Sequence, residues 1–309
     1  MRVLILGAGG VGGYFGARLH EAGGDVTFLA RPARARQLRD HGLRIASPLG
    51  DTRLEPRVVV GGELAGGYDA VMLACKSYDL PAAINAIAPA IGPTTVVIPL
   101  LNGVAHLDAL DARFGREAVH GGLAHMAITL LPDGTIQHLN AMNRFTVGSR
   151  GTNGSQVLTT MAATLADSSV EFSVSHDIEQ AMWDKFVFLA TLASATCLMR
   201  ASIGEIVRSE GGEQLISGLL SECVRVATAS RHAPGAGSLA EYRRLLTDPD
   251  STLTASMLRD VERGGATEAE HVIGDMVRRA SAEGIPVPLL AIACTHMRAY
   301  ERRRSQAGG

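Results

Sequence analysis

The strongest constraint on the fold is the segment GAGGVG, which follows the apolar run RVLILG and opens a stretch with helical spacing. A strand that turns through glycines into a helix is typical of dinucleotide binding, because the backbone can turn tightly and approach a pyrophosphate. The free N–H groups at the start of the helix also suit phosphate. A glycine-rich turn without a ligand is the alternative. The residues expected to contact the dinucleotide are Gly7, Ala8, Gly9, Gly10, Val11 and Gly12.

The first half of the chain alternates short apolar runs with helical patterns, which predicts a parallel sheet covered on both faces. A Pro-Asp-Gly turn between two apolar runs predicts antiparallel strands or a hairpin within residues 120–148. The other strands are expected at residues 2–7, 25–30, 68–76, 94–103 and 170–175.

From residue 177 onward, almost everything has the spacing of helices. The sequence therefore predicts an α/β fold, with an N-terminal Rossmann-type dinucleotide-binding domain (1–175) followed by an all-α C-terminal domain (176–309). The helices of the second domain are expected at residues 177–199, 212–230, 239–246, 252–263, 267–282 and 289–303.

Composition narrows the classes of partner. The formal net charge of −2 gives no global field that would favour nucleic acid or an anionic membrane.

The four cysteines lie far apart without a CxxC pair, which indicates reduced thiols and a cytoplasmic location. We expect no signal peptide and no uninterrupted membrane span. No Cys, His and carboxylate spacing resembles a metal site, so we expect no metal.

The end of the second predicted strand bears on the type of cofactor. A site for NAD usually carries an acidic residue there, to hold the ribose 2′-hydroxyl. This chain has Leu29 and Ala30, followed by Arg31. A guanidinium can clasp a 2′-phosphate through two donors, so the pattern favours NADP(H), with Arg34 also expected nearby. The alternative is that Arg31 only caps its helix.

Two further strand ends carry polar residues, Lys76 after VMLAC and Asn102 after VVIPLL. Ligands of open α/β sheets bind beyond the carboxyl ends of the strands, so both side chains are expected beside the cofactor. The alternatives are an exposed loop lysine for Lys76 and a simple turn residue for Asn102.

Lys185 stands in the segment MWDKFVFLATLASATCLM, which otherwise has the composition of a core helix. At 100° per residue, Lys185 falls on the apolar face, with Thr191 and Ser194 on or near the opposite face. An amine on an apolar face has a lowered pKa, which suits proton transfer. The alternative is a lysine whose stem packs while its amine reaches water.

Taken together, the motifs resemble the ketopantoate reductase (2-dehydropantoate 2-reductase) family over nearly the whole chain. The resemblance implies NADPH and a 2-oxo acid held in a cleft between the two domains, with hydride transfer giving a 2-hydroxy acid. The expected reaction is reduction of 2-dehydropantoate to pantoate, in pantothenate biosynthesis. The matching segments are GAGGVG, Arg31, CKSYD, LLNGV, WDKF, SMLRD, and TEAEH followed by GIPVP.

The resemblance also implies roles for single residues. Lys185 matches the catalytic lysine and Glu268 the glutamate near it. Ser256 matches the serine that holds the substrate carboxylate. Asn102 matches the cleft asparagine and is expected to contact both substrate and cofactor, and Glu268 is expected to contact the cofactor as well as to act in catalysis. Lys76 and Arg31 match cofactor-contacting positions.

The chain departs from the family pattern at Leu189 and Ala193, where pocket asparagines are usual. Both lie on the Lys185 side of the helix, so the substrate-binding pocket should favour a more apolar 2-oxo acid. The alternatives to 2-dehydropantoate are therefore such an acid, or a catalytically silent NADP(H)-binding sensor.

Other polar residues are expected to be structural. We assign such a role to Asp260, one helical turn after Ser256, and to the histidines His125 and His271. The sequence leaves the oligomeric state open, although the helical domain offers surfaces for a homodimer.

Overall fold

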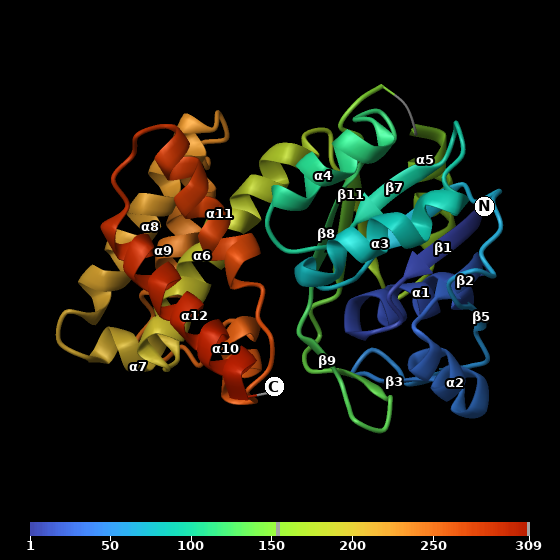
Figure 1. Ribbon diagram of the computed structural model, residues 1–309, viewed down its shortest axis with the longest axis horizontal. Coiled ribbons are helices and arrows are strands. Elements are labelled where there is room, and N and C mark those ends of the chain that lie inside the picture. The colour runs from blue at the N-terminus through green and yellow to red at the C-terminus, as the bar shows by residue number, and fades with distance from the viewer. Residues whose placement is uncertain (153–154, 308–309) are drawn as a thin grey trace. The chain divides into compact units, whose positions relative to one another are not determined.

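The computed structural model describes residues 1–152 and 155–307, which group into two compact units. The first unit contains Met1–Leu101 and His106–Ile178, and the second contains Asn102–Ala105 and Glu179–Gly309. In the described part of the chain, every strand lies in the first unit, and the second is built of helices (Figure 1). The predicted α/β fold followed by helices is confirmed. The domain boundary after residue 175 stays a prediction, and residues 102–105 group with the helical unit.

The first unit is organised around a parallel sheet with the strand order β5-β2-β1-β6-β7. The order reverses between β1 and β6, which makes the carboxyl ends of these strands the expected ligand edge. The central strand β1 is fully buried at Val3, Leu4 and Ile5, as expected of a parallel strand covered on both faces. The strands are β1 (Arg2–Leu6), β2 (Asp25–Leu29), β5 (Arg57–Val59), β6 (Ala70–Leu73) and β7 (Val96–Pro99).

Two smaller sheets complete the strands of this unit, with the orders β4-β3-β10-β9 and β12-β11-β8. The predicted hairpin is confirmed, since β9 and β10 pair antiparallel across the Pro-Asp-Gly turn, where Gly134 has φ of 84°. Strands β3, β4 and β5 were not predicted, because each has three or four residues and shows little periodicity. The strands are β3 (Leu43–Ala46), β4 (Thr52–Leu54), β8 (Gly121–His125), β9 (Ile128–Leu130), β10 (Ile136–His138), β11 (Arg144–Gly148) and β12 (Glu171–Val174).

Helix α1 (Gly10–Glu21) joins the parallel sheet to the three-stranded sheet. On one side, Gly16 is so close to the parallel sheet that a Cβ would lie 2.5 Å from Ile5 Cδ1. On the other side, Phe15 stacks on Phe145 of β11 with ring centroids 4.7 Å apart. The core of the first unit is therefore continuous through this helix. The other helices of the unit are α2 (Pro32–His41), α3 (Leu80–Ile87), α4 (Ala105–Phe114) and α5 (Ser155–Leu165).

The second unit surrounds the long helix α6 (Ile178–Met199) with six further helices in the described residues. Five of the six predicted helices recur with shifts of a few residues at their ends, and α10 is shorter than predicted. Helix α7 was missed, although Ser202 and Glu205 form the capping box that begins it. The helices are α7 (Ile203–Arg208), α8 (Gly212–Ala229), α9 (Ala236–Leu246), α10 (Ser256–Glu262), α11 (Ala269–Ala282) and α12 (Pro288–Ala307).

Helix α6 lacks the exposed polar face that its periodicity predicted. Thr191 and Ser194, placed on the polar face by periodicity, are fully buried. The Thr191 hydroxyl donates to the carbonyl of Val187 at 2.9 Å, so this polar atom is satisfied within the helix itself. By length and composition α6 could cross a membrane, although Asp184 and Lys185 interrupt its apolar sequence, as expected. However, 67% of its apolar window is buried inside the protein, which is equally typical of a core helix.

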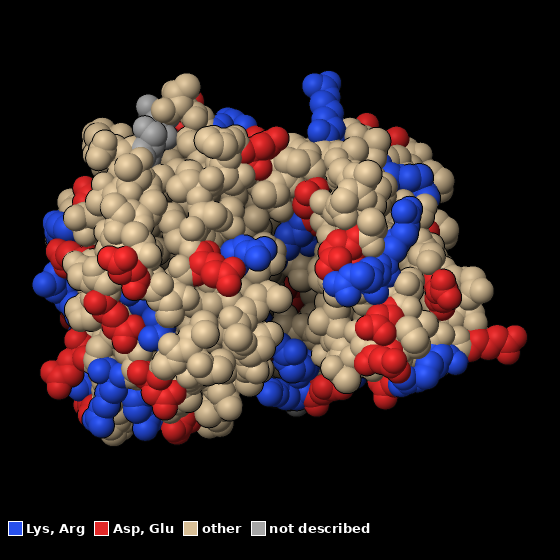
Figure 2. Space-filling model, turned by 180° about the vertical axis from the view of Figure 1, so that it is seen from behind, with Lys and Arg blue, Asp and Glu red and all other residues tan. Residues whose placement is uncertain are grey.

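Charges on the surface are mixed. Figure 2 shows lysine and arginine side chains interspersed with aspartate and glutamate on one face of the molecule. Several of these charges form exposed pairs, such as Arg57 with Asp25 at 2.9 Å. Exposed pairs of this kind contribute little to stability, because water and salt screen them.

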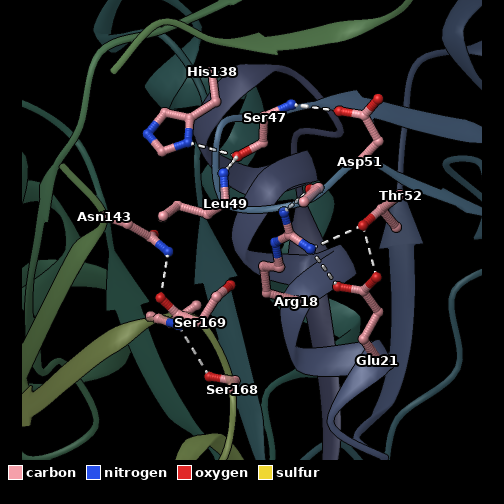
Figure 3. A network of polar contacts seen from close by, with 12 residues as sticks. Arg18, Glu21, Ser47, Leu49, Asp51, Thr52, His138, Asn143, Ser168 and Ser169 are labelled. Carbon is pink, nitrogen blue, oxygen red and sulfur yellow. Dashed lines mark hydrogen bonds and ion pairs between the residues drawn. The ribbon is translucent and has the colours of Figure 1, made fainter. Parts of the chain in front are cut away.

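A buried arginine ties the loop after β3 to helix α1 (Figure 3). Arg18 is 6% exposed, and its guanidinium donates to Glu21, to the Thr52 hydroxyl and to the carbonyl of Gly50. Thr52 in turn donates to Glu21 at 2.6 Å. The three side chains therefore hydrogen-bond to one another. Removal of the arginine would leave Glu21, Thr52 and the Gly50 carbonyl without these hydrogen bonds.

We predict that Arg18→Met lowers the free energy of unfolding of the first unit by about 2–3 kcal/mol, because it breaks a largely buried charged network. Arg57→Met is the control, since it removes an arginine from an exposed pair and should cost about 0.5 kcal/mol or less. Urea unfolding of both variants measures the difference. Equal losses in the two variants would contradict a stabilising role for the buried network.

Candidate functional site

Two glycines of the turn are required by the packing of α1 on the sheet. Gly7 has φ of 103°, and a Cβ there would lie 2.7 Å from the Ala74 carbonyl oxygen. A Cβ on Gly12 would lie 2.2 Å from the Gly7 carbonyl oxygen and 2.7 Å from Ala74 Cβ. The chain can therefore pass from β1 into α1 at this angle only if both positions lack a side chain.

Gly9 differs from these two glycines. Its backbone is extended, with φ of −88°, and a Cβ there would meet no described atom within 4 Å. Packing within the described structure therefore does not explain the absence of a side chain. Gly9 precedes the first turn of α1, where backbone N–H groups are available to an anion. The turn thus fits a pyrophosphate that approaches the backbone at Gly9.

Arg34 links the glycine turn to the β9–β10 hairpin through hydrogen bonds. Its Nε donates to the Ala8 carbonyl at 2.9 Å, and its Nη1 donates to the Gly134 carbonyl of the β9–β10 hairpin at 3.1 Å. The sequence placed Arg34 near a 2′-phosphate, whereas two of its nitrogens are engaged in holding the glycine turn.

Arg31 and Lys76 follow β2 and β6, which flank β1 in the sheet. Arg31 is exposed at the start of α2, and Lys76 is partly buried before the short 3-10 turn Ser77–Asp79. Arg31 also forms an ion pair of 2.6 Å with Asp79, which sequence reasoning did not identify. The two basic residues and the glycine turn thus occupy three neighbouring strand ends, as predicted.

In the second unit, all four predicted substrate residues line one pocket of about 30 Å³. Asn102 reaches it from the loop that groups with this unit, and Leu189 and Ala193 reach it from α6. Ser256 lies at the start of α10, and Glu268 immediately precedes α11. Its lining is Asn102, Leu189, Ala193, Ala255, Ser256, Met257, Asp260, Glu268 and Val272.

Sequence reasoning missed three apolar members of this lining, namely Ala255, Met257 and Val272. Each looks like an ordinary core residue in the sequence, and no local pattern marks it. Asp260, which was expected to be structural, also lines the pocket. The i, i+4 spacing places it on the same helix face as Ser256.

Lys185 lies one helical turn before Leu189 on α6, and the same spacing puts the two on one face of the helix. The lysine is partly buried, and burial lowers its pKa from 10.5 to about 8. The shift has the direction expected for an amine on an apolar face. The expected contact between Lys185 and Glu268 stays a prediction.

The two predicted structural histidines lie in different units. His125 is in β8 of the first unit, and His271 is in α11 of the second. Burial lowers the pKa of His271, which favours its neutral form. The Gly103 turn packs against this helix, since a Cβ on Gly103 would lie 3.2 Å from the His271 carbonyl oxygen.

A larger hollow of about 610 Å³ is a shallow surface depression beside α2. It contains none of the predicted site residues, and acidic and basic groups are mixed in its lining. The lining residues are Gln37, Asp40, His41, Arg44, Arg53 and Asp133.

The composition of the chain gives one further signal. Lys76 and Lys185 are the two lysines among 29 lysine and arginine residues, and all the others are arginines. Arginine stays protonated in proteins, whereas a buried lysine can lose its proton near neutral pH. Both lysines are at predicted site positions, and every other basic side chain of the Lys and Arg type is an arginine.

Family models described as "Ketopantoate reductase PanE/ApbA" and "Ketopantoate reductase PanE/ApbA C terminal" match residues 3–151 and 177–301. The chain belongs to the ketopantoate reductase family. It is 34% identical to the uncharacterized oxidoreductase YkpB of Bacillus subtilis, over 98% of this chain and 100% of that protein. It is 26% identical to the 2-dehydropantoate 2-reductase of Mesorhizobium japonicum, over 98% of this chain and 99% of that protein.

A solved structure of a PanE/ApbA family ketopantoate reductase from Ralstonia eutropha JMP134 is similar throughout. The TM-score is 0.88 at 27% identity, over 99% of this chain and 100% of that chain. The protein is therefore an oxidoreductase of the ketopantoate reductase type, which acts on a CH–OH group. Its cofactor is a nicotinamide dinucleotide, in agreement with the geometry at Gly9.

We predict opposite effects for alanine at two glycines of the turn. Gly12→Ala should lower the melting temperature by several degrees, because its Cβ meets backbone and Ala74 at forbidden distances. Gly9→Ala should leave melting unchanged and weaken NADPH binding by about tenfold or more, because the methyl group separates backbone from pyrophosphate. Thermal melting and cofactor fluorescence titration measure the two effects. Normal NADPH affinity in Gly9→Ala would exclude this glycine from the binding surface.

Proposed function

We propose that the protein reduces 2-dehydropantoate to pantoate with NADPH, as part of pantothenate biosynthesis. The observation that carries the proposal is the position of Lys185, whose pKa is about 8, one helical turn before a pocket lined by Asn102, Ser256 and Glu268. The 2-dehydropantoate 2-reductase of Mesorhizobium japonicum, similar over nearly the whole chain, supports this substrate.

The proposed chemistry follows from the charge that develops on the substrate. When bound, NADPH supplies the hydride that reduces the 2-oxo carbon, and the ketone oxygen then becomes an alkoxide. In our proposal the ammonium of Lys185 stabilises this oxygen and delivers its proton. Its lowered pKa makes proton transfer easier than it is from an ordinary lysine.

The remaining pocket residues would hold the substrate in place. We assign Ser256 to the substrate carboxylate, because its hydroxyl can donate to that group from the start of α10. Asn102 would orient the substrate and the nicotinamide end of the cofactor. Glu268 would keep Lys185 charged before the reaction, since a nearby carboxylate favours the ammonium form.

For the cofactor, the glycine turn from Gly7 to Gly12 would hold the pyrophosphate. We assign Arg31 to the 2′-phosphate of NADPH and Lys76 to a further cofactor contact at the end of β6. Exposure of Arg31 at the start of α2 supports its assignment, because a guanidinium largely in solvent can leave its ion pair and turn towards a phosphate. The cytoplasmic location and the homodimer stay predictions.

A second candidate substrate is a 2-oxo acid with a more apolar tail. Leu189 and Ala193 line the pocket together with Ala255, Met257 and Val272, so much of its surface offers no hydrogen bond. A substrate with a distal hydroxyl would leave that group unpaired against this surface, whereas an alkyl tail would not. NADPH oxidation with 2-dehydropantoate and with a panel of alkyl 2-oxo acids separates the two substrates. Oxidation with none of them would favour the silent sensor.

We predict that Lys185→Ala lowers turnover by a factor of about 100 or more, which is typical for the loss of a general acid, while NADPH still binds. In the unmodified protein, turnover should fall about tenfold per pH unit above pH 8, because Lys185 must be protonated and its pKa is about 8. Steady-state kinetics between pH 6 and 10 measure both effects. Near-normal turnover in the variant, or a wild-type profile flat through pH 8–10, would rule out this role.

We predict that Leu189→Asn raises kcat/KM for 2-dehydropantoate relative to an alkyl 2-oxo acid by about tenfold or more, because an amide can bond the distal hydroxyl. The same measurement on Leu192→Met serves as the control, since Leu192 is buried on α6 and is not among the residues that line the pocket. An unchanged ratio in Leu189→Asn would show that this position does not select the substrate.

A further inference from the structure

An ion pair crosses the ligand edge of the parallel sheet. Arg31 follows β2, Asp79 follows β6, and Arg31 Nη2 lies 2.6 Å from Asp79 Oδ1. Strand β1 lies between β2 and β6, so these two strands are about 10 Å apart. The pair therefore reaches across the end of β1, where the glycine turn begins.

This geometry changes the expectation drawn from the end of β2. Residues 29–31 contain no acid, which favoured NADPH on the sequence alone. Asp79 supplies a carboxylate to the same region from a different strand end, 48 positions further along the chain than Arg31. No pattern local to β2 can reveal it.

The two nicotinamide dinucleotides would meet this pair in opposite ways. The 2′-phosphate of NADPH is attracted by the guanidinium of Arg31 and repelled by the carboxylate of Asp79. The 2′-hydroxyl of NADH is a donor, and a carboxylate beside it accepts its hydrogen bond. Arg31 therefore favours NADPH, and Asp79 favours NADH.

The pair can also open. The Arg31 side chain is 75% exposed and that of Asp79 is 29% exposed, so water already solvates much of the interaction. An exposed pair is weak, and a phosphate with two acceptor oxygens can draw the guanidinium away from Asp79. The carboxylate then remains near the phosphate and repels it.

We propose that Asp79 is a specificity-determining residue whose carboxylate reduces the preference for NADPH over NADH that Arg31 provides. The proposal rests on the proposed function only in that the first unit binds these cofactors through this edge of the sheet. It does not depend on which 2-oxo acid is reduced.

The test is a fluorescence titration of the full chain with NADPH and with NADH, in the absence of any oxo acid. The measured quantity is the ratio of the Kd for NADH to the Kd for NADPH. Asp79→Asn should raise this ratio about fivefold or more, because it removes a negative charge beside the phosphate. Asp79→Ser should act in the same direction, and Arg31→Gln should lower the ratio.

Glu63→Gln is the matched control, because it removes a carboxylate from another exposed pair, with Arg39 at 3.5 Å, outside the proposed site. Its ratio should equal that of the unmodified protein. Ratios within twofold of wild type in both Asp79 variants would overturn the proposal and leave the proposed reaction intact. A shifted ratio without reduction of any 2-oxo acid would support the proposal and overturn the reaction. Failure of the unmodified protein to bind either dinucleotide would overturn both.

Discussion

The close approach of α1 to the end of β1 is the constraint on which the first unit depends. Gly12 lies against the Gly7 carbonyl and Ala74 with no room for a side chain, and this contact sets the angle at which the helix leaves the sheet. The same angle brings Phe15 onto Phe145 and so connects the parallel sheet to the three-stranded one. A single packing requirement therefore fixes both the ligand edge and the core behind it.

The second unit is organised around a buried helix that carries an ionisable amine. Helix α6 is buried on nearly every side, and yet it carries an amine whose ionised form is costly to bury. Neighbours hold this part of the helix firmly. Trp183, two residues before Lys185, stacks on His232 with ring centroids 5.2 Å apart, and the Arg279 guanidinium lies over its ring. The helix thus holds one amine in a desolvated position, where its pKa is lowered. Shifted pKa values of this kind are typical of functional sites.

Sequence alone predicted those parts of the fold that rest on periodicity and turn chemistry. The strand, glycine turn and helix at residues 2–21 and the Pro-Asp-Gly hairpin were recovered because local patterns specify them. Strands β3, β4 and β5 were not, since strands of three or four residues are too short to show a recognisable alternation of side chains. The polar face assigned to α6 was wrong because Thr191 bonds its own helix backbone, which lets a hydroxyl be buried.

The same division holds for the candidate site. Lys185, Ser256 and Glu268 were predicted through motifs. Met257 and Asp79 were not, because only contacts between distant segments bring Met257 to the pocket lining and Asp79 to Arg31.

The scarcity of lysine has a practical consequence for chemical labelling. Reagents that acylate or reductively alkylate amines can modify this chain at the N-terminal amine, Lys76 and Lys185. At pH 7 a pKa of about 8 leaves roughly a tenth of Lys185 as the neutral, nucleophilic amine, more than a hundredfold above an ordinary lysine. Apart from the N-terminal amine, amine coupling to a dye would therefore label only predicted site positions, and protection of these by cofactor or oxo acid would report occupancy.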